Sequence, residues 1–193
     1  MILGTITWES FINTRVNPRG VQFQFEDLCR QIFKNDFLNN DNGKKNDLIH
    51  SNPNNPGLEA NPVFDESSKR WFGYQVKFFE NNVNYNEILK SAKQIVQHYR
   101  GKVDDVYLFC NKPIKNTAKT YLKIEDFLEA NNIRIILVTD NEILDRVRKY
   151  PYLANYYFNA HTITHDWVVE HTQQVVSTLG ERYNPNFNIA TNS

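Results

Sequence analysis

Apolar and polar side chains alternate with a period of two over residues 72–79, which predicts a β-strand. Because successive side chains of a strand point to opposite faces, its apolar members share one face: Tyr74, Val76 and Phe78. The other face carries Gln75 and Lys77, two polar side chains that point the same way from an otherwise apolar strand. Such a pair predicts a functional role for that face.

A second, shorter strand is expected to begin at Glu59 and to form a hairpin with the first through a polar turn. If that turn is centred between Ser67 and Ser68, Glu59 lies opposite Val76 and faces away from the two polar side chains. We expect a one-residue shift, or a bulge near Pro62, that brings Glu59 to the face of Gln75 and Lys77.

Further elements follow from apolar spacing along the rest of the chain. Helical periodicity predicts one helix over residues 21–35 and another over residues 165–179. Between them it predicts a helix from the cap Asn84 to Gly101, one that ends near residue 131, and one that begins at Asp140. Nearly continuous apolar runs predict strands buried on both faces over 103–111 and 133–139. This alternation predicts parallel strands with right-handed crossovers. The fold class is therefore α/β: a mixed sheet, with an antiparallel hairpin plus parallel strands, flanked by helices.

Bulk properties narrow the functional classes. A chain of 193 residues fits one domain, and 22 basic against 22 acidic residues give no net charge, which argues against a protein that coats nucleic acid. Cys29 and Cys110 have neither disulfide nor zinc-site spacing and are expected to be buried apolar residues of a cytoplasmic protein. The sequence shows no secretory leader and no apolar run long enough to span a membrane, so no membrane partner is expected.

The motif Gly57-Leu58-Glu59, the hairpin and then Gln75-x-Lys77 resemble the core of the PD-(D/E)xK nuclease superfamily, most closely its restriction-endonuclease-like, Mrr-type branch. The resemblance covers roughly residues 20–160, and Glu59 stands where the family usually has Asp. It implies a Mg²⁺-dependent endonuclease that hydrolyses double-stranded DNA, with Mn²⁺ as an alternative metal.

The resemblance also implies roles for individual residues. Glu59, the amide oxygen of Gln75 and the backbone carbonyl of Val76 would hold the metal, because hard divalent cations prefer oxygen ligands. Lys77 would contact the scissile phosphate or position the attacking water. Gln75 replaces a carboxylate, so metal affinity without DNA should be weak.

Glu26 lies in the predicted helix upstream of the hairpin and has two interpretations. It is a fourth catalytic residue, an outer acid that orients the attacking water. Alternatively, it is a solvated acid in the first turn, where the helix dipole favours negative charge.

Several lysines are candidates for contacts with the DNA backbone, and a solvated helix face or loop is the alternative for each. Lys44 and Lys45 fall in the polar loop 39–55, together with His50, a lone loop histidine that rarely acts as a ligand or base. The other candidates follow the strand at 103–111: Lys115, Lys119 and Lys123.

The last residues suggest a domain boundary. Residues 1–178 would form the nuclease-like domain, and residues 179–193 resemble the linker that joins effector domains to the STAND-type NTPase of bacterial antiviral sensors. This implies the effector of an antiphage defence protein, activated by oligomerisation. The alternatives are a catalytically inactive nuclease fold that binds nucleic acid or a protein, and a structural domain that assembles through the helix at 165–179.

Overall fold

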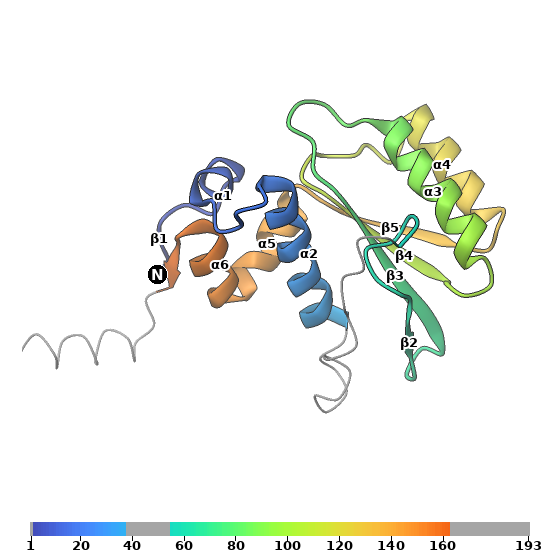
Figure 1. Ribbon diagram of the computed structural model, residues 1–193, viewed down its shortest axis with the longest axis horizontal. Helices are drawn as coiled ribbons and strands as arrows, with labels where there is room; N and C mark the ends of the chain where they lie inside the picture. Colours follow the sequence, from blue (N-terminus) through green and yellow to red (C-terminus); the bar gives the residue numbers. More distant parts are fainter. Residues whose placement is uncertain (1, 38–54, 163–193) are drawn as a thin grey trace, which may run out of the picture.

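The computed structural model of the chain describes residues 2–37 and 55–162 (Figure 1). Its elements are β1 (Ile2–Leu3), α1 (Trp8–Thr14), α2 (Val21–Phe37), β2 (Val63–Asp65), β3 (Arg70–Lys77), α3 (Tyr85–Tyr99), β4 (Asp105–Cys110), α4 (Lys119–Glu129), β5 (Arg134–Thr139), α5 (Asn141–Lys149), α6 (Pro151–Phe158) and β6 (His161–Thr162). None of the described helices is both long enough and apolar enough to cross a lipid bilayer.

A four-stranded mixed sheet in the order β2-β3-β4-β5 forms the centre of the molecule. The hairpin β2-β3 is antiparallel, whereas β3, β4 and β5 run parallel. In Figure 1, α3 and α4 lie on one side of the sheet, and α1, α2, α5 and α6 lie on the other. The predicted α/β class and mixed sheet are confirmed.

Two apolar cores follow from this layering, one on each face of the sheet. Tyr74 and Val76 of β3 belong to the core on the α2 side. Gln75 lies on the opposite side, against residues of α3 such as Ile88 and Ser91. The alternation predicted for β3 is therefore confirmed.

The N-terminal ends of the parallel strands are joined by one ionic cluster. Asp105, the first residue of β4, is fully buried and accepts two hydrogen bonds from Arg70 and two from Arg134, which begin β3 and β5. Burial alone would raise the pKa of Asp105, but the guanidinium bonds outweigh it and lower the pKa. The cluster therefore fixes the register of all three strands at the same end.

Two predictions about elements are wrong in detail. β5 is mostly half-buried rather than buried on both faces, because it is the edge strand of the sheet. β2 begins at Val63 and not at Glu59, which instead lies in the bend that precedes the strand. The predicted helix at 165–179, the linker at 179–193 and nearly all of the loop 39–55 lie outside the described residues.

Candidate active site at the edge of strand β3

Glu59 reaches β3 through an interruption of the hairpin. Val63 pairs with Phe72, so an unbroken ladder would place Asn61 opposite Tyr74. Instead the Glu59 N–H donates to the Tyr74 carbonyl, at 3.0 Å. The irregularity expected near Pro62 is thus present, but it displaces the pairing by two residues, which does not change the face of the sheet.

The Glu59 side chain meets Gln75 in another way, along the edge of β3. Its Oε1 accepts a hydrogen bond from the Val76 N–H at 3.0 Å and one from Gln75 Nε2 at 2.5 Å. The carboxylate therefore takes the place that the carbonyl of a neighbouring strand would have. Gln75 Nε2 also donates to the Val76 carbonyl at 3.0 Å. The amide nitrogen thus lies between the two oxygens predicted as metal ligands.

Glu26 and Lys77 complete the group. Glu26 comes from the second turn of α2, and Lys77 is the last residue of β3. Both act electrostatically on Glu59, and Lys77 also acts on Glu26. Of the four predicted catalytic residues, Glu59 and Gln75 are therefore in contact, and Glu26 and Lys77 lie near enough to affect the charge of Glu59.

Burial dominates the ionisation of both acids. It raises the pKa of Glu59 to about 7, with Glu26 adding to the rise and the Val76 N–H and Lys77 opposing it. Burial also raises the pKa of Glu26, and the positive charge of Arg19 opposes that rise. Both carboxyl groups therefore hold a proton more tightly than an exposed carboxyl group, which suits general acid–base chemistry.

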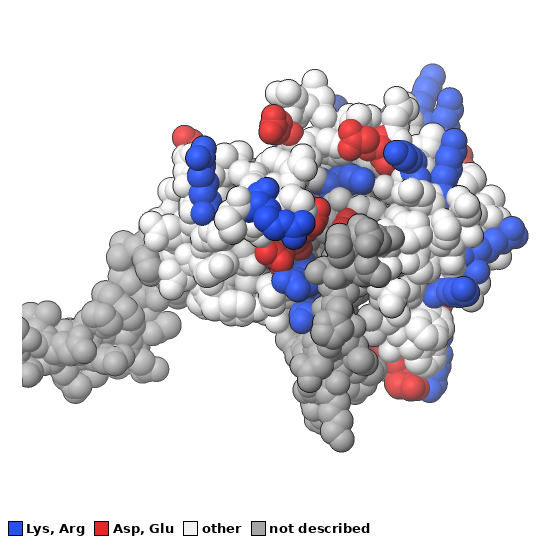
Figure 2. Space-filling view, in the orientation of Figure 1, with Lys and Arg blue, Asp and Glu red and all other residues white. Residues whose placement is uncertain are grey.

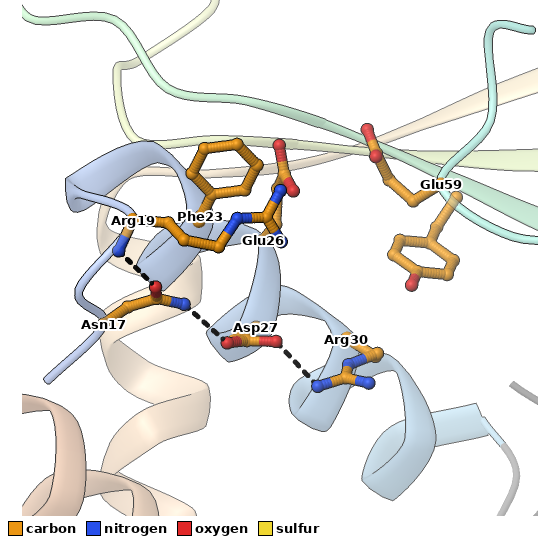
Figure 3. Close-up of a pocket in the computed structure, with 8 residues that line it drawn as sticks. Asn17, Arg19, Phe23, Glu26, Asp27, Arg30 and Glu59 are labelled. Atoms are coloured by element: carbon orange, nitrogen blue, oxygen red, sulfur yellow. Dashed lines mark hydrogen bonds and ion pairs between the residues drawn. The ribbon is translucent and has the colours of Figure 1, made fainter. Parts of the chain in front are cut away.

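A pocket between α2 and the sheet contains these acids (Figure 3). Its lining is mostly polar and charged: Asn17, Arg19, Phe23, Glu26, Asp27, Arg30, Glu59 and Tyr74. In Figure 3 the Glu26 and Glu59 carboxylates lie on the same side of the pocket, and the Arg19 guanidinium lies beside Glu26. Figure 2 shows basic and acidic side chains intermingled near the middle of the view. In the pocket itself, Arg19 and Arg30 partly offset the negative charge of the acids.

The sequence analysis missed the two arginines of this pocket. Arg19 lies over the ring of Phe23, 3.6 Å from its centroid. Arg30 forms an ion pair with Asp27 at 2.6 Å. Arg30 could have been found from its spacing, because it follows Glu26 by four residues and so shares its helix face. Arg19 precedes the helix, and no periodic pattern identifies it.

The donor atoms fit a hard divalent cation once one group turns. Glu59 and the Val76 carbonyl supply oxygen, and a half-turn of the Gln75 amide about its last bond would present oxygen instead of nitrogen. Among the described residues, Glu59 is the one carboxylate that lies at these oxygens. Consistent with this, no cluster of three or more His, Cys, Asp or Glu side chains suited to a metal occurs within residues 2–37 and 55–162.

The predicted DNA-contacting lysines that the structure describes do not line this pocket. Lys115, Lys119 and Lys123 are exposed, on or just before α4. α4 packs mainly on α3 and β5, and β5 is the edge strand at the opposite end of the sheet from β2. Lys44, Lys45 and His50 lie outside the described residues. A role for these lysines in binding DNA stays a prediction.

No protein-family model matches the chain, and no curated protein matches it. Its function is therefore inferred from the geometry and charge of the site.

Proposed function

We propose that this chain is a Mg²⁺-dependent DNA endonuclease domain, with Mn²⁺ as an alternative metal. One observation carries the proposal: Glu59 and Gln75 are hydrogen-bonded at the edge of β3, and Glu26 and Lys77 lie near enough to act electrostatically on the Glu59 carboxylate. Two carboxylates, an amide and an ammonium in one region are the groups that phosphodiester hydrolysis needs.

Each residue has a distinct task in this proposal. Glu59, Gln75 and the Val76 carbonyl would hold the cation, which when bound supplies Lewis-acid stabilisation of the phosphate and a more acidic water. Lys77 neutralises negative charge that develops on the phosphate. Glu26 accepts the proton of the attacking water, a task that its raised pKa favours, because a base is most effective when its pKa lies near the working pH.

The cellular role in this proposal is that of an effector in antiphage defence, activated by oligomerisation in the cytoplasm. The zero net charge supports it, because such a chain attracts DNA only weakly on its own. Assembly of several copies would raise the local concentration of sites on one duplex.

Cleavage of supercoiled plasmid in Mg²⁺ or Mn²⁺ tests the activity. We expect nicked and linear products from the wild type, and a loss of at least about a hundredfold in rate for Glu59→Gln and Lys77→Ala. Two exposed residues outside the pocket give matched controls, Glu66→Gln in the hairpin turn and Lys90→Ala on α3. Cleavage that persists in Glu59→Gln, or that survives removal of metal by EDTA, would contradict the proposal.

A second candidate is a catalytically inactive nuclease fold that binds nucleic acid. The Gln75 amide favours it, since Nε2 bridges Glu59 Oε1 and the Val76 carbonyl, where a cation would have to bind. The same assay separates the two functions. A wild type that binds the plasmid but leaves it intact with either metal, alone and in its assembled form, supports the binding module.

A further inference from the structure

Arg30 has a hydrogen-bond donor for which the described residues provide no acceptor. Its Nη2 donates to Asp27 Oδ1 at 2.6 Å, but its Nε is buried without a hydrogen-bond partner. No other buried side-chain nitrogen or oxygen in residues 2–37 and 55–162 lacks a partner. Buried polar groups in proteins are nearly always bonded, so this exception calls for an explanation.

The surroundings of Arg30 indicate what the missing acceptor is. Arg30 lines the same pocket as Glu59, and its positive charge acts on the buried Tyr74 hydroxyl. Its side chain is 26% exposed, so a ligand that enters the pocket can reach the side chain, although Nε itself is covered. A guanidinium presents its donors in a planar fork that matches the oxygens of a phosphate group.

Asp27 partly neutralises the positive charge that Arg30 presents to a ligand. It pairs with Arg30 through Oδ1 and accepts a second hydrogen bond through Oδ2, from Asn17 Nδ2 at 3.0 Å. Figure 3 shows Asn17, Asp27 and Arg30 as a continuous chain of interactions along the pocket. Asp27 thus orients the guanidinium but also offsets its charge.

We propose that Arg30 binds a backbone phosphate of the DNA next to the Glu59 carboxylate, and that Asp27 positions Arg30 and weakens this contact. The inference rests on the proposed function, since it assigns the pocket to DNA. The phosphate displaces the groups that cover Arg30 Nε and accepts a hydrogen bond from it through a non-bridging oxygen, while Nη2 keeps its bond to Asp27.

The two partners should then have opposite effects on DNA affinity. Arg30→Gln removes the phosphate donor, so binding weakens by about tenfold, as expected for one charge-assisted hydrogen bond. Asp27→Asn keeps an acceptor for Asn17 but removes the offsetting charge, so binding strengthens severalfold. A merely structural ion pair predicts no such opposition, because the loss of either partner would only destabilise the fold.

Fluorescence anisotropy with a labelled DNA duplex of random sequence, in EDTA and over a range of salt concentrations, measures both effects on the full chain. Loss of one phosphate contact should also make the slope of log Kd against log salt shallower by about 0.9. Arg148→Gln and Asp145→Asn are matched controls, since they form an ion pair of the same i, i+3 spacing on α5, outside the pocket. Neither should change affinity or slope.

The outcomes separate this inference from the proposed function. An unchanged Kd and salt slope for Arg30→Gln would overturn the inference even if the wild type cuts plasmid, and so would a wild type that binds no duplex at low salt. Opposite shifts for Arg30→Gln and Asp27→Asn, in a protein that never cuts, would support the Arg30 contact and reject the nuclease.

Discussion

At the scale of single residues, hydrogen bonding and burial act in opposite directions on the pKa of Glu59. Its carboxylate accepts two hydrogen bonds at the edge of β3, yet burial still raises its pKa to about 7. The Glu59 carboxyl therefore titrates closer to neutral pH than an exposed glutamate does. A bound cation would compete with that proton, so metal affinity should rise with pH through the same range.

The pH dependence of stability tests this assignment. The folded pKa of about 7 lies above the ordinary 4.5, so the folded protein binds the proton more tightly than the unfolded chain. The resulting stabilisation is fully present below pH 4.5 and is lost as the pH rises through 7. Glu59→Gln, which stays neutral and keeps the shape, should therefore be more stable than the wild type at pH 8, by up to roughly 3 kcal/mol.

Urea unfolding at pH 5 and pH 8 gives the measurement. The advantage of Glu59→Gln should be small at pH 5 and large at pH 8. Glu66→Gln is the control, because Glu66 is exposed in the turn and pairs only with Lys69 in the solvent. Equal pH profiles for the wild type and Glu59→Gln would show that Glu59 titrates normally.

Residue patterns identified most of the candidate site but not its geometry. The sequence pattern identified Glu59, Gln75 and Lys77 because polar side chains are conspicuous on an apolar strand. The prediction of the sheet face on which Glu59 lies failed because it assumed regular backbone pairing of Glu59 with β3. Instead, the Glu59 side chain accepts the hydrogen bond from the Val76 N–H that a neighbouring strand would accept. The unpaired donor of Arg30 follows from packing between α2 and the sheet, which no local pattern encodes.

At the scale of elements, the bend before β2 decides where Glu59 lies. Gly57 has φ +80°, and a Cβ at this position would meet the Ser91 carbonyl oxygen at 2.7 Å and the Ile95 nitrogen at 2.8 Å. Both are backbone atoms of α3, which cannot move aside as a flexible side chain would. The absence of a side chain at residue 57 therefore lets the bend rest directly on the helix.

Gly57→Ala should destabilise the protein by roughly 2–4 kcal/mol, through backbone strain together with the clash against α3. Gly20→Ala is a matched control, because Gly20 also has a positive φ, +109°, but a Cβ there would meet no atom within 4 Å. It should cost only about 1 kcal/mol. Urea denaturation of both variants measures the difference, and equal losses would mean that the contact with α3 is unimportant.

The elements themselves were largely predictable, since capping and periodicity are local. The side chain of Asn84 accepts a hydrogen bond from the Asn86 N–H at the start of α3, and its amide donates to Glu87. The burial of β5 was not predictable, because an apolar strand has the same sequence pattern at the centre of a sheet as at its edge. Strand order depends on long-range pairing.

At the scale of the whole molecule, the site spans the boundary between two layers. Glu26 belongs to the helices on one side of the sheet, and Gln75 faces α3 on the other. The strand β4 connects the two cores, with Leu108 in the α3 core and Phe109 in the α2 core. If the layers unfold together, the site exists only in the fully folded protein.

Truncation of either core should therefore destabilise the whole domain in a single transition. Leu108→Ala and Phe109→Ala each remove a buried side chain, so we expect losses of roughly 2–5 kcal/mol for both. Tryptophan fluorescence and far-UV circular dichroism should give coincident urea transitions in each variant. If one variant instead shows two separated transitions, its layer unfolds alone, and Glu26 can leave the site while the sheet keeps Gln75 and Lys77 in place.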